Sequence, residues 1–290
     1  MSMETLAGET SDYSIYRRVV SQLLQGEEQL PSLPAITLDI RRALGDAQVP
    51  MSALVRLIGR DPALSALLMK HASCALYRHS HAPKTLQDVI TLLGMGEVDR
   101  ITMTHSIKSL FTLHSPAHKR LFVEAWGRLV LKASTSALLA RLLGHVAPQH
   151  ALLASLLSEV GTLAVLSAFR DASTPPNQEL YGKLCREYSK SLGVIVLKKW
   201  AVNDEYIEVT RQAGNWQSTS SPRIDLLDLV NLALYHALKE RHADIELPPL
   251  QELAAYRKLL PPQNFIGENG ELRLIIERRE DIHAIADTLR

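Results

Sequence analysis

The 290-residue sequence has only two cysteines, few aromatic residues and almost no net charge. Cys74 and Cys185 lie far apart and lack the spacing of a metal-ligand pair, which fits a reducing compartment such as the cytoplasm. The 32 basic residues are offset by 31 acidic ones, so the formal charge is +1. Because this charge attracts no acidic partner, we expect neither nucleic acid nor a membrane surface as a binding partner.

The sequence also lacks a secretory signal. Residues 1–10 carry two acids and show no basic segment followed by an apolar one. One apolar run, from Ala151 to Phe169, has the composition of a membrane span, but it is marginal in length and contains Glu159. We therefore expect this run to be a buried core helix of a soluble, cytoplasmic protein.

Alternation of apolar and polar residues, which is typical of a strand, is missing from residues 30–113. Helical periodicity predicts about five short helices there instead. Asp61 and Pro62 supply an N-cap acid followed by proline, and Thr85 with Asp88 has the pattern of a capping box. The apolar content of 46%, with an aliphatic bias, also favours an all-α fold.

The second half of the sequence continues the helical pattern. Helices are predicted over residues 118–144, 180–189 and 193–200, and Asn203 is placed to start another. A strongly amphipathic helix follows from about Pro222.

Residues 265–276 carry a different pattern. The polar residues 268–271 separate Phe265 and Ile266 from an apolar segment, which predicts a small β-hairpin. An extended loop is the alternative, because an isolated two-stranded hairpin is only marginally stable.

The most informative stretch is residues 156–162 within the apolar run. Apolar residues recur there at helical spacing and define a stripe that faces a core: Leu152, Leu156, Val160 and Leu163. Glu159 interrupts these leucines, and burial of its carboxylate is costly without a partner. We therefore expect Glu159 to pair with Arg128 or another base; the alternative is that Glu159 faces solvent at a helix edge.

Residues 156–162 read Leu-Leu-Ser-Glu-Val-Gly-Thr and resemble the central helix of the HD superfamily of metal-dependent phosphohydrolases, Leu-Leu-His-Asp-Ile-Gly-Lys. Ser158 stands at the histidine position and Glu159 at the aspartate position, while Thr162 replaces the lysine and Gly161 is kept. This departure resembles the HDOD family, bacterial signalling modules that are related to HD domains but lack their catalytic residues.

The resemblance to HDOD domains extends over roughly residues 28–225. The family opens with Leu-Pro-x-Leu-Pro and continues with Asp-Pro-Ala-Leu. An Ala-Asn-Ser-Ala-Phe-Tyr turn follows, whose Asn and Ser are replaced in this chain. A helix that ends in Leu-Gly, a tryptophan and a Gly-x-x-Leu-x-x-Trp helix come later. The matching positions are Leu30, Pro31, Leu33, Pro34, Asp61, Pro62, Ala72, Ala75, Tyr77, Gly94, Trp126, Gly161, Gly193 and Trp200.

The resemblance divides the chain into three parts. Residues 29–225 would form the HDOD domain, with an N-terminal helical subdomain (29–113) and a degenerate HD-like subdomain (114–225). Residues 1–28 would be a leader helix that acts as a packing arm, and the remainder, 226–290, a C-terminal helical extension.

The resemblance also implies that the protein is not an enzyme. Metal-dependent hydrolysis of phosphoesters needs several convergent histidine and aspartate ligands. Arg128, Ser189 and Gln212 stand at or near further histidine positions, and with Ser158 and Glu159 they mark the degenerate site where a ligand or partner would bind. No catalytic residue, metal or other cofactor is expected. The implied function is a non-catalytic signalling module that binds protein partners, in cyclic di-GMP, stress or motility circuits.

Two other functions stay open. One is a phosphohydrolase, such as a cyclic-dinucleotide phosphodiesterase, with an atypical metal site. The other is a non-catalytic nucleotide sensor that uses the cavity near Ser158 and Arg128. A separate group of residues could be considered as a metal site, but its spacing is not a zinc pattern and surface or capping roles are expected: His71, Cys74, His79 and His81.

Overall fold

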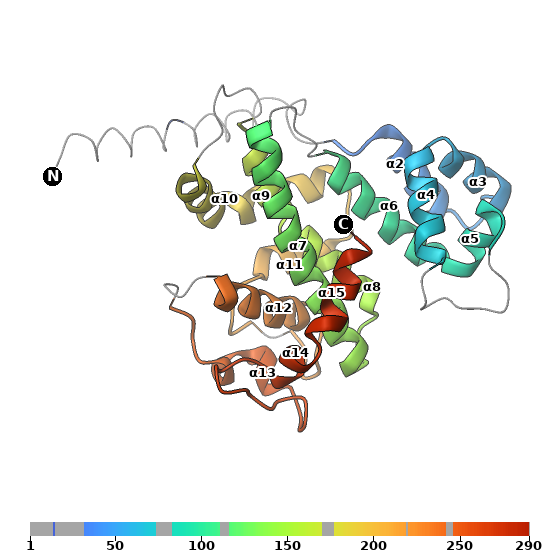
Figure 1. The fold of residues 1–290 in the computed structure, drawn as a ribbon. Helices are drawn as coiled ribbons and strands as arrows, with labels where there is room; N and C mark the ends of the chain where they lie inside the picture. Colours follow the sequence, from blue (N-terminus) through green and yellow to red (C-terminus); the bar gives the residue numbers. More distant parts are fainter. Residues whose placement is uncertain are drawn as a thin grey trace. The chain divides into compact units, whose positions relative to one another are not determined.

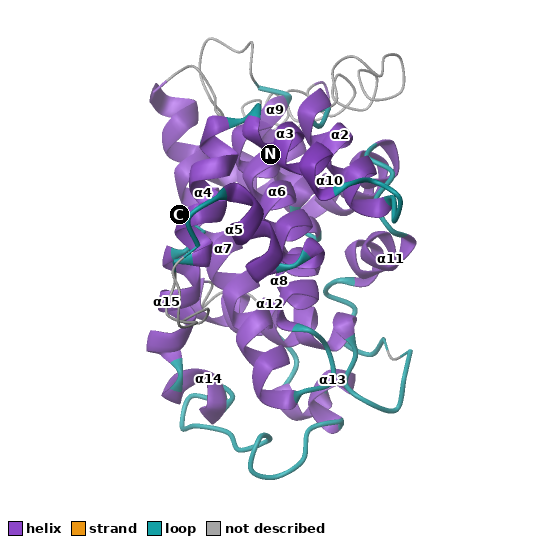
Figure 2. Ribbon diagram, turned by 90° about the vertical axis from the view of Figure 1, so that its right-hand side faces the viewer, coloured by secondary structure: helices purple, strands orange, loops and turns teal. Residues whose placement is uncertain are grey.

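The computed structural model describes Ser14 and residues 32–73, 83–110, 116–169, 177–218, 220–241 and 246–289. The chain divides into two compact units, Leu33–Leu110 and Phe111–Thr288. Helices, purple in Figure 2, dominate these described ranges, and no sheet occurs in them. The prediction of an all-α fold is confirmed. The predicted leader, residues 1–28, lies outside the described residues except for Ser14.

The described residues of the unit Leu33–Leu110 are mostly helical (Figure 1). Its described helices are α2 (Ala35–Gly45), α3 (Met51–Gly59), α4 (Pro62–Ala72), α5 (Leu86–Leu93) and α6 (Met95–Leu110). Side chains from all of them meet in one core that includes Ile40, Leu54, Leu68, Ile90 and Ile101.

Local start signals set the helix boundaries in this unit. The Asp61 carboxylate accepts a hydrogen bond from the Leu64 backbone N–H at 2.9 Å, and Pro62 occupies the first turn of α4. Thr85 and Asp88 form the predicted reciprocal capping box at α5. Each cap satisfies backbone N–H groups that have no partner within the helix, so both helix starts are confirmed.

The unit Phe111–Thr288 is organised around α7 (Pro116–Leu143), the long green helix of Figure 1. The other described helices are α8 (Pro148–Leu157), α9 (Val160–Ser167), α10 (Gln178–Lys199), α11 (Asp204–Gln212), α12 (Leu226–Arg241), the 3₁₀ helix η2 (Leu250–Glu252), α13 (Ala254–Arg257), α14 (Arg273–Glu277) and α15 (Arg279–Asp287). The helices α8, α12 and α15 pack against α7, and α9 packs against α10.

The apolar run from Ala151 to Phe169 forms two helices, not the single helix that the sequence predicted. α8 ends at Leu157, Ser158 caps it, and Glu159 has φ −109° and ψ 4° before α9 begins. Within the described residues, Pro148–Ser167 is long and apolar enough to span a membrane, but 78% of its most apolar window is buried inside the protein. Its apolar side chains therefore belong to the core of this unit.

α9 and α10 approach each other closely at Gly161 and Gly193. A Cβ atom on Gly161 would lie 1.7 Å from the backbone oxygen of Ser189, and one on Gly193 would lie 3.1 Å from Thr210 Cγ2. No larger residue fits at Gly161 unless the two helices separate. The start of α9 therefore lies directly against the backbone of Ser189 in α10.

Two other sequence predictions need correction. The helices expected over residues 180–189 and 193–200 form one continuous helix, α10, because Gly193 stays helical where it packs against Thr210. The β-hairpin is reduced to a single antiparallel bridge between Ile266 and Leu272. The apolar residues after this bridge form α14, so the second strand does not exist.

Candidate functional site

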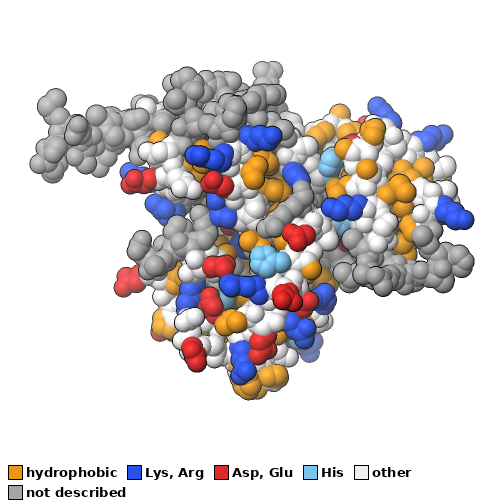
Figure 3. Space-filling view, viewed as in Figure 1, with side chains coloured by type: hydrophobic (Ala, Val, Ile, Leu, Met, Phe, Trp, Pro, Cys, Tyr) orange, Lys and Arg blue, Asp and Glu red, His pale blue; other side chains and the backbone are white. Residues whose placement is uncertain are grey.

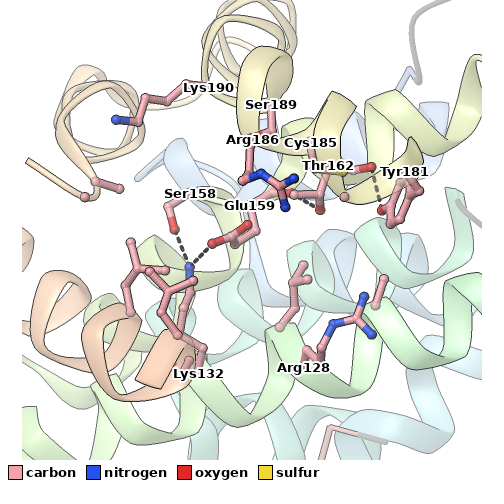
Figure 4. A pocket seen from close by; sticks show the side chains of 18 of the residues that line it. Arg128, Lys132, Ser158, Glu159, Thr162, Tyr181, Cys185, Arg186, Ser189 and Lys190 are labelled. Carbon is pink, nitrogen blue, oxygen red and sulfur yellow. Dashed lines mark hydrogen bonds and ion pairs between the residues drawn. The ribbon is translucent and has the colours of Figure 1, made fainter. Parts of the chain in front are cut away.

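A cavity of about 790 Å³ opens in the unit Phe111–Thr288, and its volume is in the usual range for small-molecule sites (Figure 4). Its walls come from α7, α10, α12, the α8–α9 junction and the segment that follows α11. The charged residues that line it are Arg128, Lys132, Glu159, Glu179, Arg186, Lys190 and Glu246.

The deepest polar group of the cavity is the Lys132 ammonium. Lys132 Nζ lies 2.6 Å from Glu159 Oε1 and 3.0 Å from Ser158 Oγ. The Ser158 hydroxyl donates to the Ser155 carbonyl at 2.8 Å, so its oxygen is free to accept from Lys132. Figure 4 shows the three side chains meeting at one point.

Lys132 and Glu159 form an ion pair in which one partner is fully enclosed. The Lys132 side chain is 4% exposed and the Glu159 side chain 24%. A charged group at that depth is tolerated when an opposite charge and hydrogen bonds compensate its lost hydration. The break between α8 and α9 lets Ser158 and Glu159 both face Lys132.

The expected pairing of Glu159 with a base is therefore met by Lys132, and not by Arg128. Lys132 lies four residues after Arg128 on α7, so the two share one helix face. Sequence reasoning missed Lys132 because Leu129, Val130 and Leu131 surround it with apolar residues. The spacing of four residues from Arg128 was the signal that could have found it.

Tyr181 and Cys185 on α10 line the cavity as neutral groups. Burial raises the pKa of Tyr181 well above its usual value, while its hydroxyl donates to the Thr162 carbonyl at 3.0 Å. Burial raises the pKa of the Cys185 thiol to about 12, although Arg128 opposes that shift. The thiolate that a nucleophile requires is therefore not formed at neutral pH.

The structure brings four of the five predicted site residues to the cavity: Arg128, Ser158, Glu159 and Ser189. Gln212 is not among the lining residues. It bonds with Glu208 on α11 and with Asn215 just beyond the helix, at 3.1 Å each, while its neighbour Ala213 lines the cavity. The ion pair is thus built from α7 and the α8–α9 junction without α11.

The residues of the predicted family motif mostly occupy structural positions. Pro34 is the N-cap of α2, and Trp200 the C-cap of α10. Gly94 has φ +77° between α5 and α6, a conformation that favours glycine. The buried motif side chains are Leu33, Ala72, Trp126 and Trp200. The motif positions Leu30, Pro31, Ala75 and Tyr77 lie outside the described residues, as do Cys74, His79 and His81.

The all-α architecture and the cavity beside the Ser158–Glu159 dipeptide define an HD-like helical domain. The chain belongs to the HDOD domain family, whose model matches residues 30–215. This membership makes it a regulatory or signalling domain related to HD domains. No curated protein matches the chain.

Solved structures support the fold. A protein of Shewanella amazonensis SB2B, named as a candidate metal-dependent phosphohydrolase, superposes with a TM-score of 0.75 at 21% identity over 97% of this chain and 100% of its own. An HDOD domain protein of unknown function from Geobacter sulfurreducens gives 0.63 at 18% identity over 93% and 96%. A candidate signal transduction protein of Marinobacter aquaeolei VT8 gives 0.59 at 18% over 97% and 66%.

The side chains of the site do not fit the metal that HD phosphohydrolases use. Ser158 and Glu159 offer one hydroxyl and one carboxylate, and the Lys132 ammonium already binds both. Two unit charges 4 Å apart repel by roughly 4 kcal/mol at an effective dielectric of 20, and a dication beside an ammonium by about twice that. The described residues contain no cluster of three or more His, Cys, Asp or Glu side chains that could offset this repulsion.

Proposed function

We propose that this protein is a non-catalytic signalling module that acts in the bacterial cytoplasm by binding other proteins. The observation that carries the proposal is the Lys132 ammonium, which bonds to Ser158 and Glu159 at the two positions that resemble the HD metal-binding pair. A fixed internal cation compensates the charge of Glu159 without creating a Lewis acid or activating a water molecule. Cyclic di-GMP, stress and motility circuits are the settings that the family resemblance suggests.

The surface supports a protein partner. On the face drawn in Figure 3, basic and acidic side chains are mixed, which does not favour nucleic acid. Three large apolar side chains of the C-terminal segment are exposed: Leu260, Phe265 and Ile276. Exposed apolar side chains favour contact with another protein where they form one contiguous patch.

The first experiment separates this proposal from a phosphohydrolase with an atypical site. The purified chain is incubated with Mn²⁺ and either cyclic di-GMP or bis(p-nitrophenyl) phosphate, and its bound metal is measured after gel filtration. We expect no turnover and no stoichiometric metal. One metal per chain, together with turnover that disappears in Glu159→Gln and persists in Glu179→Gln, would overturn the proposal, because Glu179 lines the cavity but is not part of the ion pair.

The second experiment tests protein binding. Proteins captured from the producing bacterium are identified, and each interaction is then rebuilt from two purified components. We expect one signalling protein to bind with the same affinity in Mn²⁺ and in EDTA, and Phe265→Ser to weaken this binding more than Val123→Ser does. Val123 is a matched control, since it is also an exposed apolar residue but lies on α7. Binding that requires a divalent metal, or the failure of every purified pair, contradicts the proposal.

A further inference from the structure

The cavity lining includes three cations that the protein itself does not neutralise. These are Arg128, Arg186 and Lys190, and no hydrogen bond or ion pair joins any of them to another described residue. Lys132, in contrast, is already paired with Glu159. The remaining acids of the lining, Glu179 and Glu246, are both exposed and bond to none of the three cations.

Two guanidinium groups line the cavity near Cys185. Arg128 projects from α7 and Arg186 from α10, and the positive charge of each acts to lower the pKa of the Cys185 thiol (Figure 4). Arg186 folds back along its own helix, with Nη1 3.5 Å from the position of a Cβ atom on Gly182. Because guanidinium groups bind carboxylate and phosphate oxygens through two parallel hydrogen bonds, these two side chains have the chemistry to hold one compact acidic group.

Apolar side chains also line the cavity. They come from α12, the segment after α11 and the stretch before η2: Trp216, Leu234, Leu238 and Leu247. Trp216 is held by an edge contact with Tyr235, with ring centroids 5.9 Å apart. A rigid indole beside leucine side chains suits a planar ring or an aliphatic chain.

We propose that this cavity binds a small organic anion whose acidic group lies between Arg128 and Arg186 and whose planar or aliphatic part lies against Trp216 and Leu238. A volume of about 790 Å³ is far larger than an inorganic phosphate requires, so the ligand has an organic part. Such a ligand would be an input to the signalling module, and the inference stands whether or not the protein partner is found.

The test measures binding of two probes that share this chemistry but differ in source. Guanosine 5′-monophosphate carries a phosphate and a planar ring, and octanoate carries a carboxylate and an aliphatic chain. Titration calorimetry of the full chain is run with each probe and with its separated halves, which are guanosine and inorganic phosphate for the first probe and octan-1-ol and acetate for the second. We expect one-to-one binding of at least one probe, at least tenfold tighter than its halves.

Substitutions locate the site. Arg186→Gln and Arg128→Gln should each weaken the bound probe at least tenfold, and Leu238→Asn should weaken it without changing the effect of salt on binding. Arg223→Gln is the matched control, because Arg223 is exposed on the same unit but does not line the cavity. Arg186 is exposed, so its substitution should leave the fold intact, and circular dichroism checks this.

Two results would overturn the inference. One is the absence of binding by both probes at about 1 mM, which corresponds to a binding free energy weaker than about −4 kcal/mol. The other is a loss of affinity in Arg223→Gln as large as in Arg186→Gln, which would indicate non-specific attraction to the surface. Neither result affects the proposal of a non-catalytic module, whose test measures metal and turnover.

Discussion

His236 makes the stability of the larger unit depend on pH. Its ring is buried on α12, where Nε2 accepts a hydrogen bond from the Leu272 N–H at 2.9 Å and Nδ1 lies 2.7 Å from the Leu232 carbonyl oxygen. Since Nε2 accepts, the proton of the neutral ring is on Nδ1. A second proton would bind to Nε2 and point at the Leu272 N–H, so that hydrogen bond would be lost. The ring therefore ties the segment before α14 to α12 only in its neutral form.

Burial, together with the nearby charge of Lys239, lowers the pKa of His236 from 6.5 to about 4. A difference of about 2.5 pKa units corresponds to about 3 kcal/mol. Above pH 6.5 both the folded and the unfolded states keep the ring neutral, so the free energy of unfolding is at its full value. As the pH falls from 6.5 to about 4, only the unfolded state binds the proton, and the folded state loses up to about 3 kcal/mol.

Urea unfolding between pH 8 and pH 4 measures this effect in the wild type, His236→Gln and His283→Gln. A glutamine at position 236 keeps a hydrogen-bond acceptor but does not titrate. The free energy of unfolding of His236→Gln should therefore fall between pH 8 and pH 4 by about 3 kcal/mol less than that of the wild type. His236 and His283 both line a second, small cavity of this unit. His283 is exposed, which makes it the matched control. Equal pH dependence in wild type and His236→Gln would refute the reasoning.

Three substitutions test the packing of the fold by urea or thermal unfolding. Gly161→Ala should cost at least about 3 kcal/mol, because its Cβ would overlap the Ser189 backbone oxygen, and a loss below about 1 kcal/mol would show that α9 and α10 separate easily. Lys258→Met should cost about 3–5 kcal/mol, since Lys258 Nζ lies 2.6 Å from the buried Asp228 carboxylate; unchanged stability at pH 7 would contradict a charged Asp228. Thr85→Ala should cost about 1 kcal/mol in the Leu33–Leu110 unit through loss of its cap, and Thr85→Ser should restore most of it.

Local signals in the sequence predicted a large part of the fold. The starts of α4 and α5 follow from Asp61 and Thr85, whose side chains bond to backbone groups within three residues. The start of α11 follows from Asn203 in the same way, because its side chain accepts from the Glu205 N–H. Such caps depend only on neighbouring residues, so the local sequence is sufficient to predict them.

The features that the sequence did not predict depend on distant contacts. α8 and α9 separate at Ser158 and Glu159 where these side chains face Lys132, which is 27 residues away from Glu159. α10 continues through Gly193 because that glycine packs on Thr210 of α11. Helical periodicity alone cannot distinguish a break from a continuation in either place, since both segments have a helical pattern on each side.

The site was predicted only in part, again because one of its contacts joins residues that are distant in the sequence. The resemblance to HD domains pointed to Ser158, Glu159, Arg128 and Ser189, which line one cavity. It did not point to Lys132, because no motif position falls there. The pairing of Lys132 with Glu159 depends on the packing of α7 against the α8–α9 junction, which helical periodicity does not predict.

The most direct test of this account is a crystal structure of the chain grown with millimolar Mn²⁺, with an anomalous difference map calculated at the manganese edge. We predict no anomalous peak beside Glu159, and a Lys132 ammonium within hydrogen-bond distance of Glu159 and Ser158. A manganese peak bound to the Glu159 carboxylate, with the Lys132 side chain turned away, would contradict it.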